Sequence, residues 1–253
     1  MYQEQRLSKI LQLLDERGQL SSKEAIGLLG VSRDTIRRDF AQLSQEGLAV
    51  RMHGGILLLQ KENPIQAYNQ RLNHSQVQKD QMASRTLELI NPGQSIFIDV
   101  STSLLRLAQK LDFEARVYTH SMDNALVLSQ HQVIDLYQLG GRFHAKNRFF
   151  YSLNEAELLK DVRLDIAFIG AAGLSDAKVT FDDQEDVMVK KLALSQARTK
   201  VLVAELEKYE RSAHFILNQI SDFDYWITDQ KPDQWLIDSL EGQVELIKVG
   251  ILP

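Results

Sequence analysis

The helix punctuation of the first sixty residues constrains the fold of this chain more than any other feature. Leu7, Ile10 and Leu14 recur at the spacing of one helix face, and Gly18 follows them as a stop. The segment Ser21–Glu24 then matches a capping box, in which a serine and a glutamate three residues later satisfy each other's backbone N–H groups. The sequence therefore predicts two consecutive helices with defined ends.

A third helix is predicted directly after the second. The second helix stops at Gly30, and Ser32 can cap a further helix over Arg33–Glu46, which Gly47 closes. Two short helices joined by a turn that contains glycine are typical of a helix-turn-helix.

The apolar period changes after the third predicted helix. Residues 48–52 and 56–59 favour two strands, and the intervening His53-Gly54-Gly55 favours a hairpin turn, so this segment has the form of a wing. The next residues are polar and show no period. We expect a winged helix-turn-helix domain over 1–59, a linker over 60–75 and a second domain over 76–253.

The third predicted helix has a surface suited to DNA. Ile36, Phe40 and Leu43 share one face and are expected to be buried, which leaves a basic face exposed in the first two turns. Arginine can bond guanine O6 and N7 as a pair, and threonine can touch a thymine methyl group. The alternative is a solvated basic helix. We expect contacts with double-stranded DNA from Ser32, Arg33, Asp34, Thr35, Arg37, Arg38, Arg51, His53 and Gly54.

Strands and helices alternate in the second part of the chain, which predicts a doubly wound, mostly parallel α/β domain. The predicted strands cover residues 95–99, 117–119, 133–139, 166–170, 201–204, 225–228 and 244–247, and the predicted helices cover 79–90, 104–111, 123–129 and 185–198.

Composition excludes several classes of site. The chain has no cysteine, so a disulfide framework, thiolate metal ligation and cysteine catalysis are excluded. Its histidines lack metal-ligand spacing and no phosphate-binding lysine loop occurs, so we expect no cofactor and no metal. The net charge of −5 argues against a protein that coats nucleic acid through its overall field. The polar start and short apolar runs predict a cytoplasmic protein without a membrane partner.

The two segments Val31-Ser32-x-x-Thr35-Ile36-Arg37-Arg38-Asp39 and Arg51-x-His53-Gly54-Gly55 resemble the DeoR family of bacterial regulators. The resemblance implies a transcriptional repressor of carbohydrate-metabolism genes that binds operator DNA. It also implies that the second domain is similar to the sugar-phosphate isomerase and deaminase fold and senses a phosphorylated sugar or related metabolite.

Family motifs locate the effector site that the resemblance implies. Asp99–Ser103 stands where the family has Asp-x-Gly-Thr-Thr, Thr119–Ser121 where it has Thr-Asn-Ser, and Glu205–Tyr209 where it has Asp-x-Ser-Lys-Phe. These departures predict either an altered ligand or a sensor that no longer binds one tightly. The expected effector contacts are Asp99, Ser101, Thr102, Ser103, His120, Ser121, Gly140, Gly141, Gly170, Glu185, Lys190 and Lys208.

Each of these motifs also has a plainer interpretation. A hydroxyl-rich loop that opens a helix suits a phosphate, but the same serines can simply cap the helix. The pair Gly140-Gly141 permits close approach of a ligand or merely a tight turn. Lys208 fits a phosphate partner or a surface lysine.

Two further expectations concern activity and assembly. An enzyme with a DNA-binding head is the alternative to a regulator, with a carboxylate base among Asp99, Glu185 and Glu205, but we expect no enzyme and no catalytic residue. Because one winged helix offers limited contact area, we expect a homo-oligomer, a dimer or tetramer, assembled through the second domain.

Overall fold

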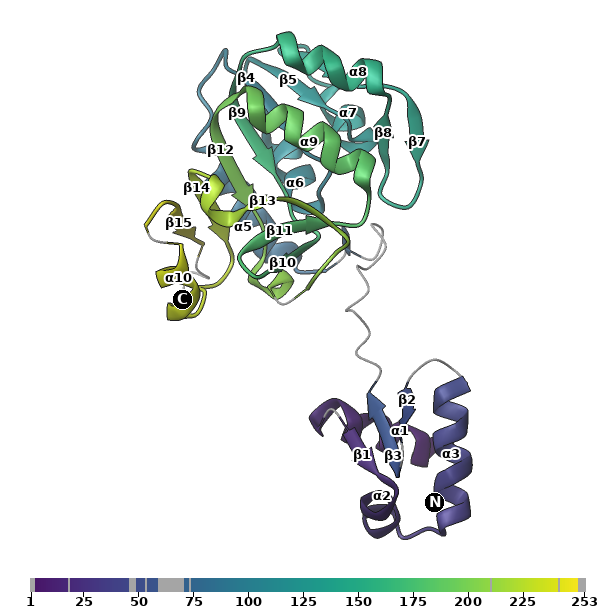
Figure 1. Ribbon diagram of the computed structural model, residues 1–253. Helices are drawn as coiled ribbons and strands as arrows, with labels where there is room; N and C mark the ends of the chain where they lie inside the picture. The colour runs from purple at the N-terminus through teal and green to yellow at the C-terminus, as the bar shows by residue number, and fades with distance from the viewer. Residues whose placement is uncertain are drawn as a thin grey trace. The chain divides into compact units, whose positions relative to one another are not determined.

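The computed structural model describes residues 3–17, 19–45, 49–52, 54–58, 71–72, 74–209, 211–240 and 242–249. The chain divides into an N-terminal unit, Met1–Pro64, and a C-terminal unit, Ile65–Pro253 (Figure 1). The division falls inside the stretch expected to be a linker. Most of that stretch, and His53, lie outside the described residues.

The N-terminal unit is a winged helix-turn-helix. Its elements are α1 (Gln3–Arg17), β1 (Gln19–Ser21), α2 (Ser22–Leu29), α3 (Arg33–Gln45), β2 (Ala49–Met52) and β3 (Gly55–Leu58). The strands form an antiparallel sheet in the order β1-β3-β2, so the wing gains a third strand that the sequence did not predict. The predicted capping box between Ser21 and Glu24 is confirmed, as is the helix stop at Gly30, which has a left-handed backbone.

One apolar face anchors α3. Ile36, Phe40 and Leu43 are buried in a core that also contains Ile10 and Leu14 of α1. The predicted buried face of this helix is therefore confirmed. The opposite face of its first two turns is left to solvent.

A seven-stranded parallel sheet forms the centre of the C-terminal unit. Its order is β15 (Glu245–Lys248), β14 (Tyr225–Thr228), β12 (Ala197–Val203), β9 (Leu164–Ile169), β4 (Ser95–Ile98), β5 (Ala115–Thr119) and β6 (Ile134–Gln138). Each neighbouring pair is parallel. The predicted fold class, a doubly wound and mostly parallel α/β domain, is confirmed.

Helices cover both faces of this sheet, and consecutive strand residues alternate between the two cores. Ile96 and Ile98 of β4 join one core, and Phe97 joins the other. The first core is closed by α5 (Gln76–Leu87), α6 (Thr102–Lys110) and α7 (Met122–Leu128), and the second by α8 (Leu153–Glu157), α9 (Gln184–Gln196) and α10 (Gln234–Ser239).

Several short elements of the C-terminal unit were not predicted. They are the hairpin of β7 (Arg142–His144) and β8 (Phe149–Tyr151), the antiparallel sheet of β10 (Gly173–Ser175), β11 (Lys178–Phe181) and β13 (Phe215–Gln219), and the helices α8 and α10. The described part of this unit also contains the 3-10 helices η1 (Leu158–Asp161), η2 (Leu206–Lys208) and η3 (Ile220–Asp222). No helix among the described residues is long and apolar enough to cross a membrane.

Candidate DNA interface and ligand site

The start of α3 presents a basic surface. Arg33, Arg37 and Arg38 are exposed and Thr35 is half-buried. Ser32 caps the helix, because its Oγ accepts a hydrogen bond from the Thr35 N–H at 3.2 Å. A helix offered in this way can place its N-terminal side chains against base edges in the major groove.

The wing, which follows α3 in the sequence, carries further residues that are predicted to contact DNA. Arg51 lies in β2, is exposed, and is paired in register with Ile56 of β3. Gly54 forms the turn with φ +90°, a conformation that favours glycine. Every predicted DNA residue in the described part of the N-terminal unit is at least partly exposed. Gly54 has no side chain, so it offers only its backbone.

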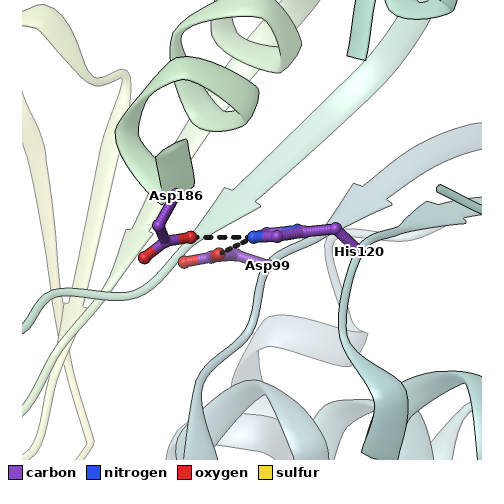
Figure 2. A group of neighbouring side chains, drawn as sticks. All are labelled: Asp99, His120 and Asp186. Carbon is purple, nitrogen blue, oxygen red and sulfur yellow. Dashed lines mark hydrogen bonds and ion pairs between the residues drawn. The ribbon is translucent and has the colours of Figure 1, made fainter. Parts of the chain in front are cut away.

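Four titratable side chains meet at the carboxyl ends of β4 and β5: Asp99, His120, Asp186 and Lys190. Figure 2 shows three of them: His120 Nε2 lies 2.8 Å from Asp186 Oδ1 and 3.8 Å from Asp99 Oδ1. Lys190, one helical turn beyond Asp186 in α9, pairs with Asp186 and lies 3.2 Å from Asp99 Oδ1. The backbone N–H of Gly170 donates to Asp99 Oδ2 at 2.9 Å. All four side chains are buried, so they form an internal network.

Charge is shared unevenly in this acid–base cluster. Burial raises the pKa of Asp99 above its ordinary value, against the opposing effect of the Lys190 ammonium. Burial also opposes ionisation of Asp186, but Lys190 and the hydrogen bond from His120 outweigh it, so the pKa of Asp186 is lowered. The negative charge of the pair is therefore held most readily on Asp186.

The same cluster has the composition of a metal site, since one ligand atom each of Asp99, His120 and Asp186 lies within 4.8 Å of the others. Lys190 Nζ, however, contacts both carboxylates and is itself fully buried. A divalent ion added beside this ammonium would leave an excess of buried positive charge, which is costly. The residues therefore fit an internal ion-pair network and not a metal site.

A second buried cluster lies around Glu205, which follows β12. Its Oε1 accepts a hydrogen bond from Ser103 Oγ at 2.7 Å, and its Oε2 lies 2.6 Å from Lys208 Nζ. Lys79 Nζ of α5 lies 3.8 Å from Glu205 Oε1. Burial opposes ionisation, but Lys208, Lys79 and Ser103 together lower the pKa of Glu205 to about 2. We call Lys79, Ser103, Glu205 and Lys208 the anion corner.

Positive charge exceeds negative charge in the anion corner. Lys79, Glu205 and Lys208 are 4%, 1% and 6% exposed, so two buried ammonium groups face one buried carboxylate. Burial lowers the pKa of Lys79 to about 8, although Glu205 opposes the shift. Lys79 also donates to the backbone carbonyl oxygens of Arg71 and His74, so the excess positive charge makes this corner a candidate site for a further anion without requiring one.

The loop after β4 joins the two clusters. Ser101 caps α6 by accepting from the Ser103 N–H at 3.3 Å, so the plainer capping interpretation of this serine holds in the structure. A Cβ on Gly170 would meet Ser101 Cβ at 2.7 Å, which explains glycine at that position. Ser121 likewise caps α7, by accepting from the Asn124 N–H at 3.2 Å. Thr102 is buried at the first position of α6.

Three of the predicted effector residues lie away from these clusters. Glu185 of α9 contacts the β7 strand instead: its Oε2 lies 2.7 Å from Arg142 Nη2 and 2.6 Å from His144 Nε2. A Cβ on Gly141 would meet the Tyr151 carbonyl oxygen at 2.2 Å, so the glycine pair serves the turn before the β7–β8 hairpin. Gly140 has open space at its Cβ position.

Sequence reasoning missed three residues of the clusters. Asp186 was passed over in favour of its neighbour Glu185, although its spacing of four residues from Lys190 puts those two on one helix face. Glu205 was expected to begin the effector motif Glu205–Tyr209 and was a candidate base, but it was not among the expected effector contacts; Lys79 was not predicted in any role. Both become visible only when distant segments meet, because Ser103 and Glu205 are 102 positions apart.

A narrow pocket opens between the acid–base cluster and the surface. It is lined by Arg71, Val100, Ser101, Asn147, Ala171, Ala172, Phe181, Asp182, Asp183 and Asp186. Its cavity volume is about 20 Å³, room for about one water molecule. A sugar phosphate does not fit this arrangement, since small-molecule sites have volumes of roughly 300–1,000 Å³.

Comparison with known proteins identifies the family. The model of the DeoR C terminal sensor domain matches residues 74–230, and that of the DeoR-like helix-turn-helix domain matches residues 6–62. The HTH-type transcriptional repressor GlcR of Bacillus subtilis (strain 168) is 33% identical over 249 residues, 98% of this chain and 96% of the relative. The lactose phosphotransferase system repressor of Lactococcus lactis subsp. lactis is 32% identical over 254 residues, 98% and 99% of the two chains.

Among solved structures, a D-ribose-5-phosphate isomerase in complex with phospho-erythronic acid aligns with a TM-score of 0.40 and 13% identity, over 53% of each chain. The sequence relationship is far stronger, and it extends over both units. This chain belongs to the DeoR family of transcriptional regulators.

Proposed function

We propose that this chain is a repressor of carbohydrate-metabolism genes, and that a phosphorylated sugar or related metabolite controls its affinity for operator DNA. Both relatives named above are repressors, and one of them represses a lactose phosphotransferase system. Its site of action would be the cytoplasm, where operator DNA is available. Mapping the genomic sites bound by the full chain tests the gene class. Sites without sugar-related genes beside them would contradict it.

DNA contact is assigned to the exposed start of α3 and to the wing. The arginines at the start of α3 supply paired donors for guanine, and Ser32 with the helix N-terminus suits a backbone phosphate. Arg51, His53 and Gly54 would contact DNA from the wing.

The observation that carries the effector proposal is the charge of the anion corner. Two buried ammonium groups and a serine hydroxyl converge there, which is the donor set that binds phosphate oxygens. In an open α/β sheet, ligands bind beside the carboxyl ends of the strands, and Ser103 and Glu205 follow two such ends.

Calorimetric titration with a panel of hexose, pentose and triose phosphates tests the effector. The wild type should bind at least one member, and Thr102→Ala combined with Lys208→Ala should weaken that binding. Lys160→Ala, at an exposed lysine of η1, is the matched control. Equal binding by the double variant would move the site elsewhere. A compound that binds without changing operator affinity would not be the effector, since control requires different affinities in two states.

Regulation is favoured over catalysis by the state of the predicted bases. Asp99 and Glu205 are fully buried and ion-paired, and Glu185 is held by Arg142 and His144. A general base needs to reach the proton that it abstracts. Incubation with hexose and pentose phosphates should therefore give no isomer, and incubation with an amino-sugar phosphate should release no ammonia. Turnover that Asp99→Asn abolishes would establish an enzyme instead.

We also propose a homo-oligomer assembled through the C-terminal unit. Specific operators are usually bound by two heads on half-sites about 34–36 Å apart, or a multiple of that distance. Light scattering on the full chain at micromolar concentration should give at least a dimer. A monomer that binds its operator with full affinity would contradict this.

A further inference from the structure

We propose that the Glu205 carboxylate occupies the position that the phosphate of an effector would take, so that the chain competes with its own ligand. The inference rests on the proposed function, because it concerns regulation of the same anion corner. On this proposal, Glu205 sets how tightly the anion corner binds an added anion and which anions can displace its carboxylate.

The surroundings of Glu205 are those of a bound anion. Its donors come from three separate elements, with Ser103 in α6, Lys208 in η2 and Lys79 in α5. Glu205 itself is 1% exposed; Ser103 and Lys208 contact it directly, whereas Lys79 faces it at the longer ion-pair distance of 3.8 Å. A ligand phosphate that approached Lys208 and Ser103 would meet a carboxylate already bound to both.

The length of the side chain matters for this contact. The backbone on each side of Glu205 is fixed, because the Ala204 N–H donates to the Ile227 carbonyl at 3.1 Å and the Leu206 N–H donates to Asp229 Oδ1 at 2.8 Å. An aspartate on this backbone would be one carbon–carbon bond, about 1.5 Å, shorter. It would keep the negative charge but retreat from Ser103 and Lys208.

Electrostatics require exchange and not addition. A phosphate monoester carries a charge of about −1.5 to −2 at neutral pH. Placing it beside a buried, ionised carboxylate is unfavourable, because repulsion is weakly screened in the interior. The phosphate would therefore bind as the Glu205 side chain swings away from Ser103 and Lys208, while the backbone on each side of it and Lys208 stay in place.

Exchange of the Glu205 carboxylate for a phosphate would also affect the residues just before α5. Lys79 Nζ donates to the backbone carbonyl oxygens of Arg71 and His74, at 2.5 and 2.8 Å, while it faces Glu205. Replacing the Glu205 carboxylate by a phosphate, which carries more negative charge, changes the electrostatic attraction on the Lys79 ammonium group. The residues just before α5 are thus joined to the anion corner through one side chain.

The test is a calorimetric titration of the full chain with inorganic phosphate at constant pH and ionic strength. Glu205→Asp shortens the competitor and keeps its charge, and Glu205→Gln keeps its length and removes the charge. Both are expected to bind phosphate at least about tenfold more tightly than the wild type, since each relieves the repulsion or the occupancy. Glu207→Gln, in the short helix η2 that follows Glu205, should bind as the wild type does, because Glu207 is about one-third exposed and faces His74 and Arg211. Circular dichroism checks that every variant is folded.

A second titration series with glucose 6-phosphate asks whether the effect holds for an esterified phosphate. Phosphate binding that either folded Glu205 variant weakens or leaves unchanged would overturn the inference, and would make Glu205 a ligand contact or a structural residue. The proposed effector class would survive that result. Binding of neither compound by any folded variant would overturn both the inference and the anionic effector.

Discussion

Arg6 of α1 holds Asp39 of α3 by two hydrogen bonds, from Nε to Oδ2 at 2.8 Å and from Nη2 to Oδ1 at 3.0 Å. The two side chains are 12% and 1% exposed. A bidentate pair of this kind fixes direction as well as distance. Because Asp39 directly follows Arg37 and Arg38, the pair sets the rotation of the surface that α3 offers to DNA.

Replacing Asp39 with asparagine should loosen this anchor. The partly buried Arg6 guanidinium would lose its charged partner, so the amides of α3 should exchange hydrogen faster and DNA binding should weaken on all sequences alike. Gln45→Ala is the control, because Gln45 lies on the same helix, is exposed and is not among the expected DNA contacts. If both variants exchange at the wild-type rate, Arg6 does not anchor the helix.

Arg38→Ala should weaken binding to the specific operator by about 1–3 kcal/mol if Arg38 bonds a base edge. Fluorescence anisotropy on operator and on unrelated DNA of the same length separates two outcomes. A loss confined to the operator assigns base contact, and an equal loss on both assigns a phosphate contact. Undiminished binding to both would remove α3 from the interface.

The fold was largely predictable because periodicity is a local property. The apolar runs of β4 and β9 and the helical period of α3 each lie within a few residues or turns of sequence. The short antiparallel strands β10, β11 and β13 escaped prediction, because runs of three to five residues carry too little pattern. These strands pair with one another, and β11 and β13 pack against α9.

The candidate site was predictable in part for the same reason. Ser101 and Lys190 follow from motifs that lie in one segment. Asp186 required the helical register of α9, in which Glu185 points about 100° away from it. The pairing of Lys79 with Glu205 depends on two elements that meet only after the sheet has formed.

Gly141→Ala should destabilise the C-terminal unit, while Gly140→Ala should be tolerated. The added Cβ at position 141 would meet the Tyr151 carbonyl oxygen at 2.2 Å, and φ there is +122°. Strain of this kind costs on the order of 1–3 kcal/mol. At position 140 nothing lies within 4 Å of a Cβ. Urea unfolding of the two variants provides the comparison, and equal midpoints would refute the packing explanation.

The last prediction concerns the acid stability of the C-terminal unit. The pKa of Glu205 is about 2 in the folded chain, against an ordinary value of 4.5. Because the folded pKa is the lower one, ionised Glu205 stabilises the folded state above pH 4.5, and this stabilisation is lost as the pH falls toward 2. The total amounts to about 3 kcal/mol.

Glu205→Gln should therefore lower stability at neutral pH and flatten its decline below pH 4.5 relative to the wild type. Urea unfolding followed by tryptophan fluorescence is a suitable measurement, because both tryptophans, Trp226 and Trp235, lie in the C-terminal unit. Trp226 is fully buried, so its emission reports loss of the core. Parallel curves for the two proteins across this range would mean that Lys79 and Lys208 do not hold Glu205 ionised, and the anion corner would lose its electrostatic basis.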